Sequence, residues 1–151
     1  MKHIGKNNKI LVINGPNINM LGKREPGIYG STTLDQINSD LKTQGEKLDL
    51  SVETFQSNHE GEIVEKIQKV FKKINGIIIN PGAYAHTSIA VRDALLIHDI
   101  PIIEVHISNI YKRESFRHIS MTADIATGQI AGFGQYGYTM ALNAMAEMIK
   151  R

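Results

Sequence analysis

In the stretch Ile100-Pro101-Ile102-Ile103-Glu104-Val105-His106-Ile107-Ser108-Asn109, a run of β-branched residues gives way to a carboxylate, an imidazole and a hydroxyl. The apolar part predicts a buried strand, and the polar residues follow where such a strand passes into its loop. In open α/β sheets, ligands bind just beyond the carboxyl ends of the strands. His106 is therefore a candidate acid or base. The alternative is that His106 only closes the strand and bonds to the backbone.

Strand and helix patterns alternate along the rest of the chain. Besides the stretch above, strand patterns occur at residues 10–13, 50–55, 77–79 and 125–131. Apolar residues at helical spacing predict helices over residues 34–48, 63–74, 87–98 and 138–149. Five strands alternating with helices predict a doubly wound parallel sheet, and the size favours the flavodoxin-like strand order 2-1-3-4-5.

The length and composition indicate one domain over residues 1–151, with residues 1–8 as an N-terminal extension. The absence of cysteine excludes disulfides, thiolate catalysis and cysteine-based zinc sites. A net charge of +2 with dispersed lysines disfavours a nucleic-acid partner. No secretory signal or membrane-spanning run is found, so we expect a cytoplasmic protein without a membrane partner.

Polar side chains follow four of the five predicted strands. Parallel strands bring these ends to one edge of the sheet, where neighbouring strands are about 5 Å apart. This convergence favours a small-molecule site over the structural alternative for His106. The residues concerned are Asn14 and Asn17, Asn58 and His59, Asn80 with His86 nearby, and Glu104, His106 and Ser108.

A glycine-rich segment from Asn19 to Thr32 is long for a connection between a strand and a helix. It carries Arg24 and Tyr29 between glycines, which favours a lid that closes over an anionic ligand. A nearby cation stabilises a phenolate, so Arg24 could activate Tyr29 as a base. The alternative is an exposed loop with incidental charges.

Other patterns carry less weight. Arg113 and Arg117 are four residues apart, which could place them on one helical turn facing an anion or on a solvated basic face. Asp93 on a predicted helix is expected at the surface unless it points toward the sheet edge. Residues 132–137 match GxGxxG, but no further βαβ unit follows, so no nucleotide cofactor is expected. The histidines show no metal-ligand spacing, and no metal is expected.

Five motifs in order resemble the type II 3-dehydroquinate dehydratases. The resemblance covers residues 9 to 149. It implies a flavodoxin-like fold, no cofactor, and a dodecamer built from trimers. It also implies the loss of water from 3-dehydroquinate to give 3-dehydroshikimate, in the shikimate pathway or in quinate catabolism. The motifs are Asn14-Gly15-Pro16-Asn17 with Leu21-Gly22, Arg24-Glu25-Pro26-Gly27-Ile28-Tyr29-Gly30, Ser57-Asn58-His59-Glu60-Gly61, Asn80-Pro81-Gly82-Ala83-Tyr84-Ala85-His86-Thr87-Ser88, and Glu104-Val105-His106-Ile107-Ser108-Asn109.

The same resemblance implies a division of labour among the catalytic residues. Tyr29, as phenolate, would remove a proton from the carbon next to the ketone, with Arg24 holding that phenolate charged. Asn17 and a bound water would stabilise the enolate. His106 would protonate the departing hydroxyl, with Glu104 orienting its imidazole. This arrangement suits general acid–base catalysis at a site dried by a closed lid.

Substrate binding is implied for a further set of residues. The ring hydroxyls would meet Asn80, His86, Asp93 and Arg117, and the carboxylate would meet the backbone amides of Ile107 and Ser108, a type of donor suited to anions. Arg113 is a weaker match. The competing hypothesis is a non-catalytic flavodoxin-like module that binds a small anion.

Overall fold

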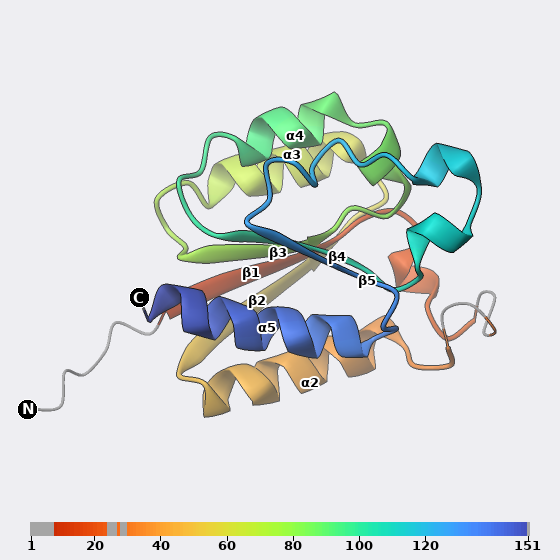
Figure 1. The fold of residues 1–151 in the computed structure, drawn as a ribbon. Coiled ribbons are helices and arrows are strands. Elements are labelled where there is room, and N and C mark those ends of the chain that lie inside the picture. The colour runs from red at the N-terminus through yellow and green to blue at the C-terminus, as the bar shows by residue number, and fades with distance from the viewer. Residues whose placement is uncertain (1–7, 24–26, 28–29, 151) are drawn as a thin grey trace, which may run out of the picture.

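The protein contains a single five-stranded parallel sheet with helices on both faces (Figure 1). The computed structural model describes residues 8–23, 27 and 30–150. The strand order is β2-β1-β3-β4-β5, which confirms the predicted doubly wound, flavodoxin-like topology. The strands are β1 (Asn8–Asn14), β2 (Leu50–Gln56), β3 (Gly76–Asn80), β4 (Ile102–His106) and β5 (Gly128–Ala131).

The helices form a layer on each side of the sheet. Helices α2 and α5 cover one face, and α3 and α4 cover the other (Figure 1). The α-helices are α2 (Leu34–Lys47), α3 (Glu60–Lys69), α4 (Ile89–Leu95) and α5 (Tyr136–Ile149). Short 3-10 helices are η1 (Ile18–Met20), η2 (Gly82–His86), η3 (Ile110–Lys112) and η4 (Ser115–Arg117). None of the helices in the described part of the chain is long and apolar enough to cross a membrane.

Alternation along the central strands divides the core into two clusters. Ile10 and Val12 of β1 pack with Ile78 of β3 on the side of α2 and α5, while the intervening side chains pack toward α3 and α4. Burial on both faces explains the continuous apolar runs of the sequence. By the same alternation, Asn14 and Asn80 belong to the α5 side, whereas Glu104 and His106 of β4 belong to the α4 side.

Several element boundaries differ from the sequence-based expectation. The fourth strand extends through His106, so this residue is the last of the strand. Helix α3 ends at Lys69, and Lys72 beyond it adopts a left-handed conformation with φ of 61°, so the helix expected over residues 63–74 ends early. Thr33 caps the start of α2. Its side chain accepts from the backbone of Gln36, whose side chain in turn accepts from Thr33.

The turns after β1 and β3 are packed into each other. Gly15 donates its backbone N–H to the carbonyl of Asn80 at 2.8 Å, and a Cβ at Gly15 would lie 2.3 Å from the carbonyl oxygen of Pro81. Gly82 has φ of +59°, and a Cβ there would lie 3.0 Å from the carbonyl oxygen of Pro16. The two turns can meet this closely only because both residues lack a side chain. They bring Asn17 and Asn80 to the same edge of the sheet.

Candidate active site

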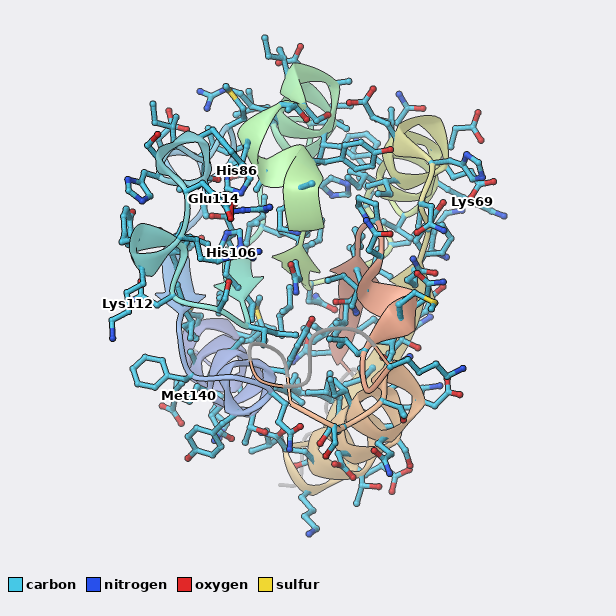
Figure 2. All side chains as sticks on the ribbon, turned by 90° about the vertical axis from the view of Figure 1, so that its right-hand side faces the viewer. Lys69, His86, His106, Lys112, Glu114 and Met140 are labelled. Atoms are coloured by element: carbon cyan, nitrogen blue, oxygen red, sulfur yellow. The ribbon has the colours of Figure 1, made fainter. Side chains whose placement is uncertain are left out.

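A pocket of about 240 Å³ lies at the carboxyl edge of β1, β3 and β4. At this edge the connection from β1 to β2 leaves toward one face of the sheet, and the connection from β3 to β4 leaves toward the other face. Doubly wound sheets bind their ligands at such a point. Figure 2 looks onto this edge, with His86, His106 and Glu114 gathered on one side of it. Predicted site residues that line the pocket are Asn17, Asn80, His86, His106, Ile107, Ser108 and Arg117, together with Arg113.

His106 and Glu104 face each other at the end of β4. Nε2 of His106 lies 3.1 Å from Oε2 of Glu104, although the alignment falls short of a full hydrogen bond. No other partner in the described part of the chain reaches this buried nitrogen, so we take the carboxylate as the group it faces. The imidazole lines the pocket, and with Nε2 turned inward, Nδ1 is the nitrogen available to a ligand.

Glu104 is fully buried and surrounded by donors. Ser120 Oγ lies 2.8 Å from Oε1 and 3.0 Å from Oε2, and Thr122 donates its hydroxyl to Oε1. Burial pushes the pKa of Glu104 upward, but the neighbouring His106 imidazole and the hydroxyls of Thr122 and Ser120 outweigh this and hold the pKa below its ordinary value. The carboxylate beside His106 is therefore ionised at neutral pH.

His86 is oriented by the backbone. Its Nδ1 lies 2.8 Å from the carbonyl oxygen of Ile119, which can only accept, so Nδ1 carries the proton. Its ring is nearly parallel to that of His106, with 6.3 Å between centroids and 20° between planes. Nε2 of His86 is thereby left as the nitrogen that a ligand in the pocket can meet.

Asn80 belongs to a buried network beneath the pocket. Its Oδ1 accepts from the backbone of Gly82 at 3.1 Å, and its Nδ2 donates to the hydroxyl of Tyr138 at 2.9 Å. That hydroxyl donates in turn to Oδ1 of Asn14 at 2.5 Å. Burial raises the pKa of Tyr138 well above its ordinary value, more than the Asn80 contact lowers it, so the phenol stays neutral. The network fixes which face of the Asn80 amide meets the pocket.

Asn17 is exposed at the mouth of the pocket in a left-handed conformation with φ of 68°. Its backbone N–H donates to Oδ1 of Asn58 at 3.0 Å. Gln56 donates to the same oxygen at 3.2 Å, and the hydroxyl of Tyr84 donates to the carbonyl of Asn58 at 2.7 Å. The end of β2 thus holds the turn that presents Asn17.

Two arginines supply positive charge to the pocket. Arg117 forms an ion pair with Glu114, whose pKa this contact lowers. Arg113 donates to Ser108 Oγ at 3.5 Å. The expectation that the two arginines share a helical turn is wrong, because η3 ends at Lys112 and η4 begins at Ser115. They reach the pocket from separate segments.

Some predicted site residues are not brought to the pocket. Asp93 is an exposed residue of α4 and is absent from the pocket lining, and Glu104 lies behind His106. Arg24 and Tyr29 lie outside the described residues. The lid expected over residues 19–32 is described only in part, with η1 at its start.

The structure also adds residues that the sequence did not single out. Ser120 and Thr122 bind Glu104 from 16 and 18 residues along the chain, and Tyr138 binds Asn80 from 58 residues away. Their residue types are ordinary for a polar connection and a helix. No sequence signal marks them, since each matters only through a contact made by folding.

Neither a metal site nor a nucleotide site is found among the described residues. No cluster of three or more potential metal ligands occurs within residues 8–23, 27 and 30–150. The GxGxxG match forms the turn from β5 into α5, where Gly132 and Gly134 donate their backbone N–H groups to the carbonyls of His106 and Ile107 at 3.2 and 3.0 Å. These two N–H groups hold the end of β4, which carries His106.

This fold and site define a doubly wound α/β protein whose pocket combines a histidine–carboxylate pair with amide and cationic side chains. Residues 8–146 match the family described as "Dehydroquinase class II". A 3-dehydroquinate dehydratase of Mesorhizobium japonicum is 57% identical, with 91% of this chain and 96% of that protein covered. One from Clostridium perfringens is also 57% identical, with 94% and 98% covered.

Solved structures agree with these relatives. The type II dehydroquinase of Propionibacterium acnes superimposes with a TM-score of 0.90 at 45% identity, and the match covers 93% of this chain and 97% of that one. The chain therefore belongs to the class II dehydroquinase family, the type II 3-dehydroquinate dehydratases, which are hydro-lyases. The resemblance expected from the sequence motifs is confirmed.

Proposed function

We propose that this chain dehydrates 3-dehydroquinate to 3-dehydroshikimate by acid–base catalysis, with His106 as the acid. The activity follows from membership of the family, a dehydratase family of the shikimate pathway. The observation that carries the mechanism is the His106–Glu104 pair, which has its carboxylate buried and its imidazole lining the pocket. A carboxylate that keeps a proton on Nε2 leaves Nδ1 to exchange a proton with the substrate.

The reaction would proceed in two halves. Tyr29, as a phenolate supported by Arg24, removes a proton from the carbon next to the ketone and leaves an enolate. Asn17 at the pocket mouth stabilises this enolate together with a bound water. The enolate then expels the neighbouring hydroxyl, which takes the Nδ1 proton of a doubly protonated His106 and leaves as water. Solvent returns the proton from Tyr29 to His106 between turnovers.

The remaining pocket residues would bind the substrate. Asn80 and His86 each offer one oriented nitrogen, and Arg117 offers a cation, to the ring hydroxyls. The backbone amides of Ile107 and Ser108 follow β4 and would receive the carboxylate, as amides in a turn do for anions. Asp93 is included by resemblance to the family alone, since it does not line this pocket.

The surroundings of the chain are also proposed from the family resemblance. We propose a cytoplasmic enzyme that needs no cofactor and assembles as a homododecamer of trimers, with neither nucleic acid nor membrane as a partner.

The test is an assay of the purified, assembled protein with 3-dehydroquinate. Ultraviolet absorbance should rise as the conjugated enone forms, and a chelator should leave the rate unchanged. Tyr29→Phe and His106→Asn should each lower kcat by about 10²- to 10⁴-fold while binding of the substrate largely survives. Absence of turnover by the wild-type protein would refute the proposal and favour an anion-binding module.

A further inference from the structure

The segment Ile119–Thr122, which we call the strap, contacts His86 directly and His106 through Glu104. It follows η4 and runs between η2 and the end of β4. Its Met121 donates a backbone N–H to the carbonyl of Ala85 at 2.6 Å, next to His86. Arg92 of α4 donates to the carbonyl of Met121 at 2.9 Å and pairs with Asp124. The strap is thereby fixed to α4 and η2.

We propose that the strap sets which ring nitrogen of each pocket histidine carries a proton, with Ser120 and Thr122 acting as positioning residues for His106 through Glu104. The proposal rests on the proposed function for its catalytic meaning. Its structural content, the tautomers of two histidines, stands on the contacts described below.

The first half of the proposal concerns His86. Nδ1 of this residue lies 2.8 Å from the carbonyl oxygen of Ile119 in the strap. A carbonyl has no proton to give, so the neutral imidazole must hold its proton on Nδ1. Nε2 then faces the ligand as an acceptor. This contact uses only the backbone of Ile119, whose side chain is 70% exposed.

The second half concerns His106 and runs through Glu104. Ser120 Oγ accepts the backbone N–H groups of Thr122 and Ala123, both at 3.2 Å, so its own proton is free for Glu104. Thr122, which is buried, donates to the same carboxyl group. The Ser120 and Thr122 hydroxyls both donate to this carboxyl group, which favours its ionised form. The carboxyl is therefore held as an acceptor that keeps a proton on Nε2 of His106.

The charges around Glu104 leave His106 as its titratable partner. The residues in register with it on the neighbouring strands are Ile79 of β3 and Gln129 of β5, which carry no charge. From α4, the charge of Arg92 is balanced by Asp124. The hydroxyls of the strap are thus the groups, besides His106, that set the charge state of the carboxyl.

The two histidines consequently present opposite nitrogens to the pocket. His86 offers Nε2 as an acceptor, and His106 offers Nδ1, which donates when the imidazole carries both protons. The nearly parallel rings, 6.3 Å apart, then place one donor and one acceptor side by side. The strap thus acts on His86 through Ile119 and on His106 through Ser120, Thr122 and Glu104.

The experiment compares Thr122→Val with Thr122→Ser. Valine keeps the shape of threonine and removes the hydroxyl, whereas serine keeps the hydroxyl. Loss of one hydrogen bond to the carboxylate should raise the pKa of Glu104, so the midpoint of its carboxyl titration, followed by infrared difference spectroscopy, should move up by about one pH unit in Thr122→Val. We expect KM to change less than twofold and Thr122→Ser to retain the wild-type midpoint. An unmoved midpoint in Thr122→Val, or an equal shift in both variants, would overturn the proposal.

A second measurement does not depend on turnover, and its wild-type part does not depend on either variant folding. In wild-type protein carrying ¹⁵N-labelled histidine, ring-nitrogen spectra above the titration of both imidazoles should show His86 protonated on Nδ1 and His106 on Nε2. In Thr122→Val, His106 should become a mixture of tautomers while His86, held by a backbone carbonyl, should not change. The opposite tautomer at either histidine of the wild type would refute the strap's role. If the wild type shows these tautomers and no turnover, the proposed function fails and the strap assignment stands.

Discussion

Replacing Tyr138 with phenylalanine removes one oxygen from the network beneath the pocket. That oxygen accepts from Nδ2 of Asn80 and donates to Oδ1 of Asn14, and all three residues are buried. Nδ2 of Asn14 already lacks a hydrogen-bond partner in the described part of the chain, so this amide has no second anchor. The substitution therefore leaves one donor and one acceptor unsatisfied without creating space for a larger rearrangement.

The expected magnitude follows from the cost of those two groups. A buried polar group left without a partner costs about 1–3 kcal/mol, so the two groups together should lower the free energy of unfolding of Tyr138→Phe by about 2–6 kcal/mol. This is a large part of the roughly 5–15 kcal/mol that stabilises a typical domain. Because Asn80 also loses its anchor, we expect KM for the substrate to rise severalfold with a smaller change in kcat.

Urea unfolding at one fixed protein concentration measures the effect, since the proposed assembly would make stability depend on concentration. Tyr136→Phe is the matched control, because Tyr136 lies two residues earlier at the start of α5 and is 58% exposed. It should change the free energy of unfolding by less than about 0.5 kcal/mol. If Tyr138→Phe costs no more than this control, the network does not stabilise the pocket floor and the reasoning fails.

Two further predictions concern Glu104 and the turn after β1. The pKa of Glu104 is held below its ordinary value, so its stabilising contribution is present above about pH 4.5 and is lost as the pH falls through the lowered pKa. In urea titrations between about pH 5 and 3, Glu104→Gln should lose stability less steeply than the wild type, and equal slopes would contradict this. Gly15→Ala would place a Cβ 2.3 Å from the carbonyl oxygen of Pro81, so we expect a loss of about 1–3 kcal/mol in unfolding free energy and reduced activity. Gly61→Ala, where no atom lies within 4 Å of the new Cβ, should show neither effect.

The order of strands and helices could be predicted because strands that are buried on both faces have continuous apolar sequences. Runs such as Ile77-Ile78-Ile79 have no polar alternation, and parallel central strands explain this. The cap at Thr33 is a local feature, since its partner Gln36 lies only three residues away. The ends of the helices are harder to predict. Apolar residues continue at helical spacing beyond Lys69, yet the left-handed conformation of Lys72 shows that the helix has already ended.

The candidate site was predictable only where its residues follow strands. Asn80 and His106 stand at strand ends, and the topology carries both to one edge. Ser120, Thr122 and Tyr138 could not be found in this way. Their partners lie 16, 18 and 58 residues away along the chain, and no sequence pattern distinguishes these three residues from others of their type. Long-range hydrogen bonds are decided by packing, which sequence periodicity does not encode.

The glycine turn between β5 and α5 limits how this scaffold can be re-engineered. Its spacing resembles a dinucleotide fingerprint, and a designer seeking a phosphate cradle would be drawn to it. Yet the amides of Gly132 and Gly134 are already bonded to the carbonyls of His106 and Ile107. Recruiting them for a phosphate would release the backbone that positions the imidazole. New binding at this turn and the existing chemistry therefore compete for the same two N–H groups.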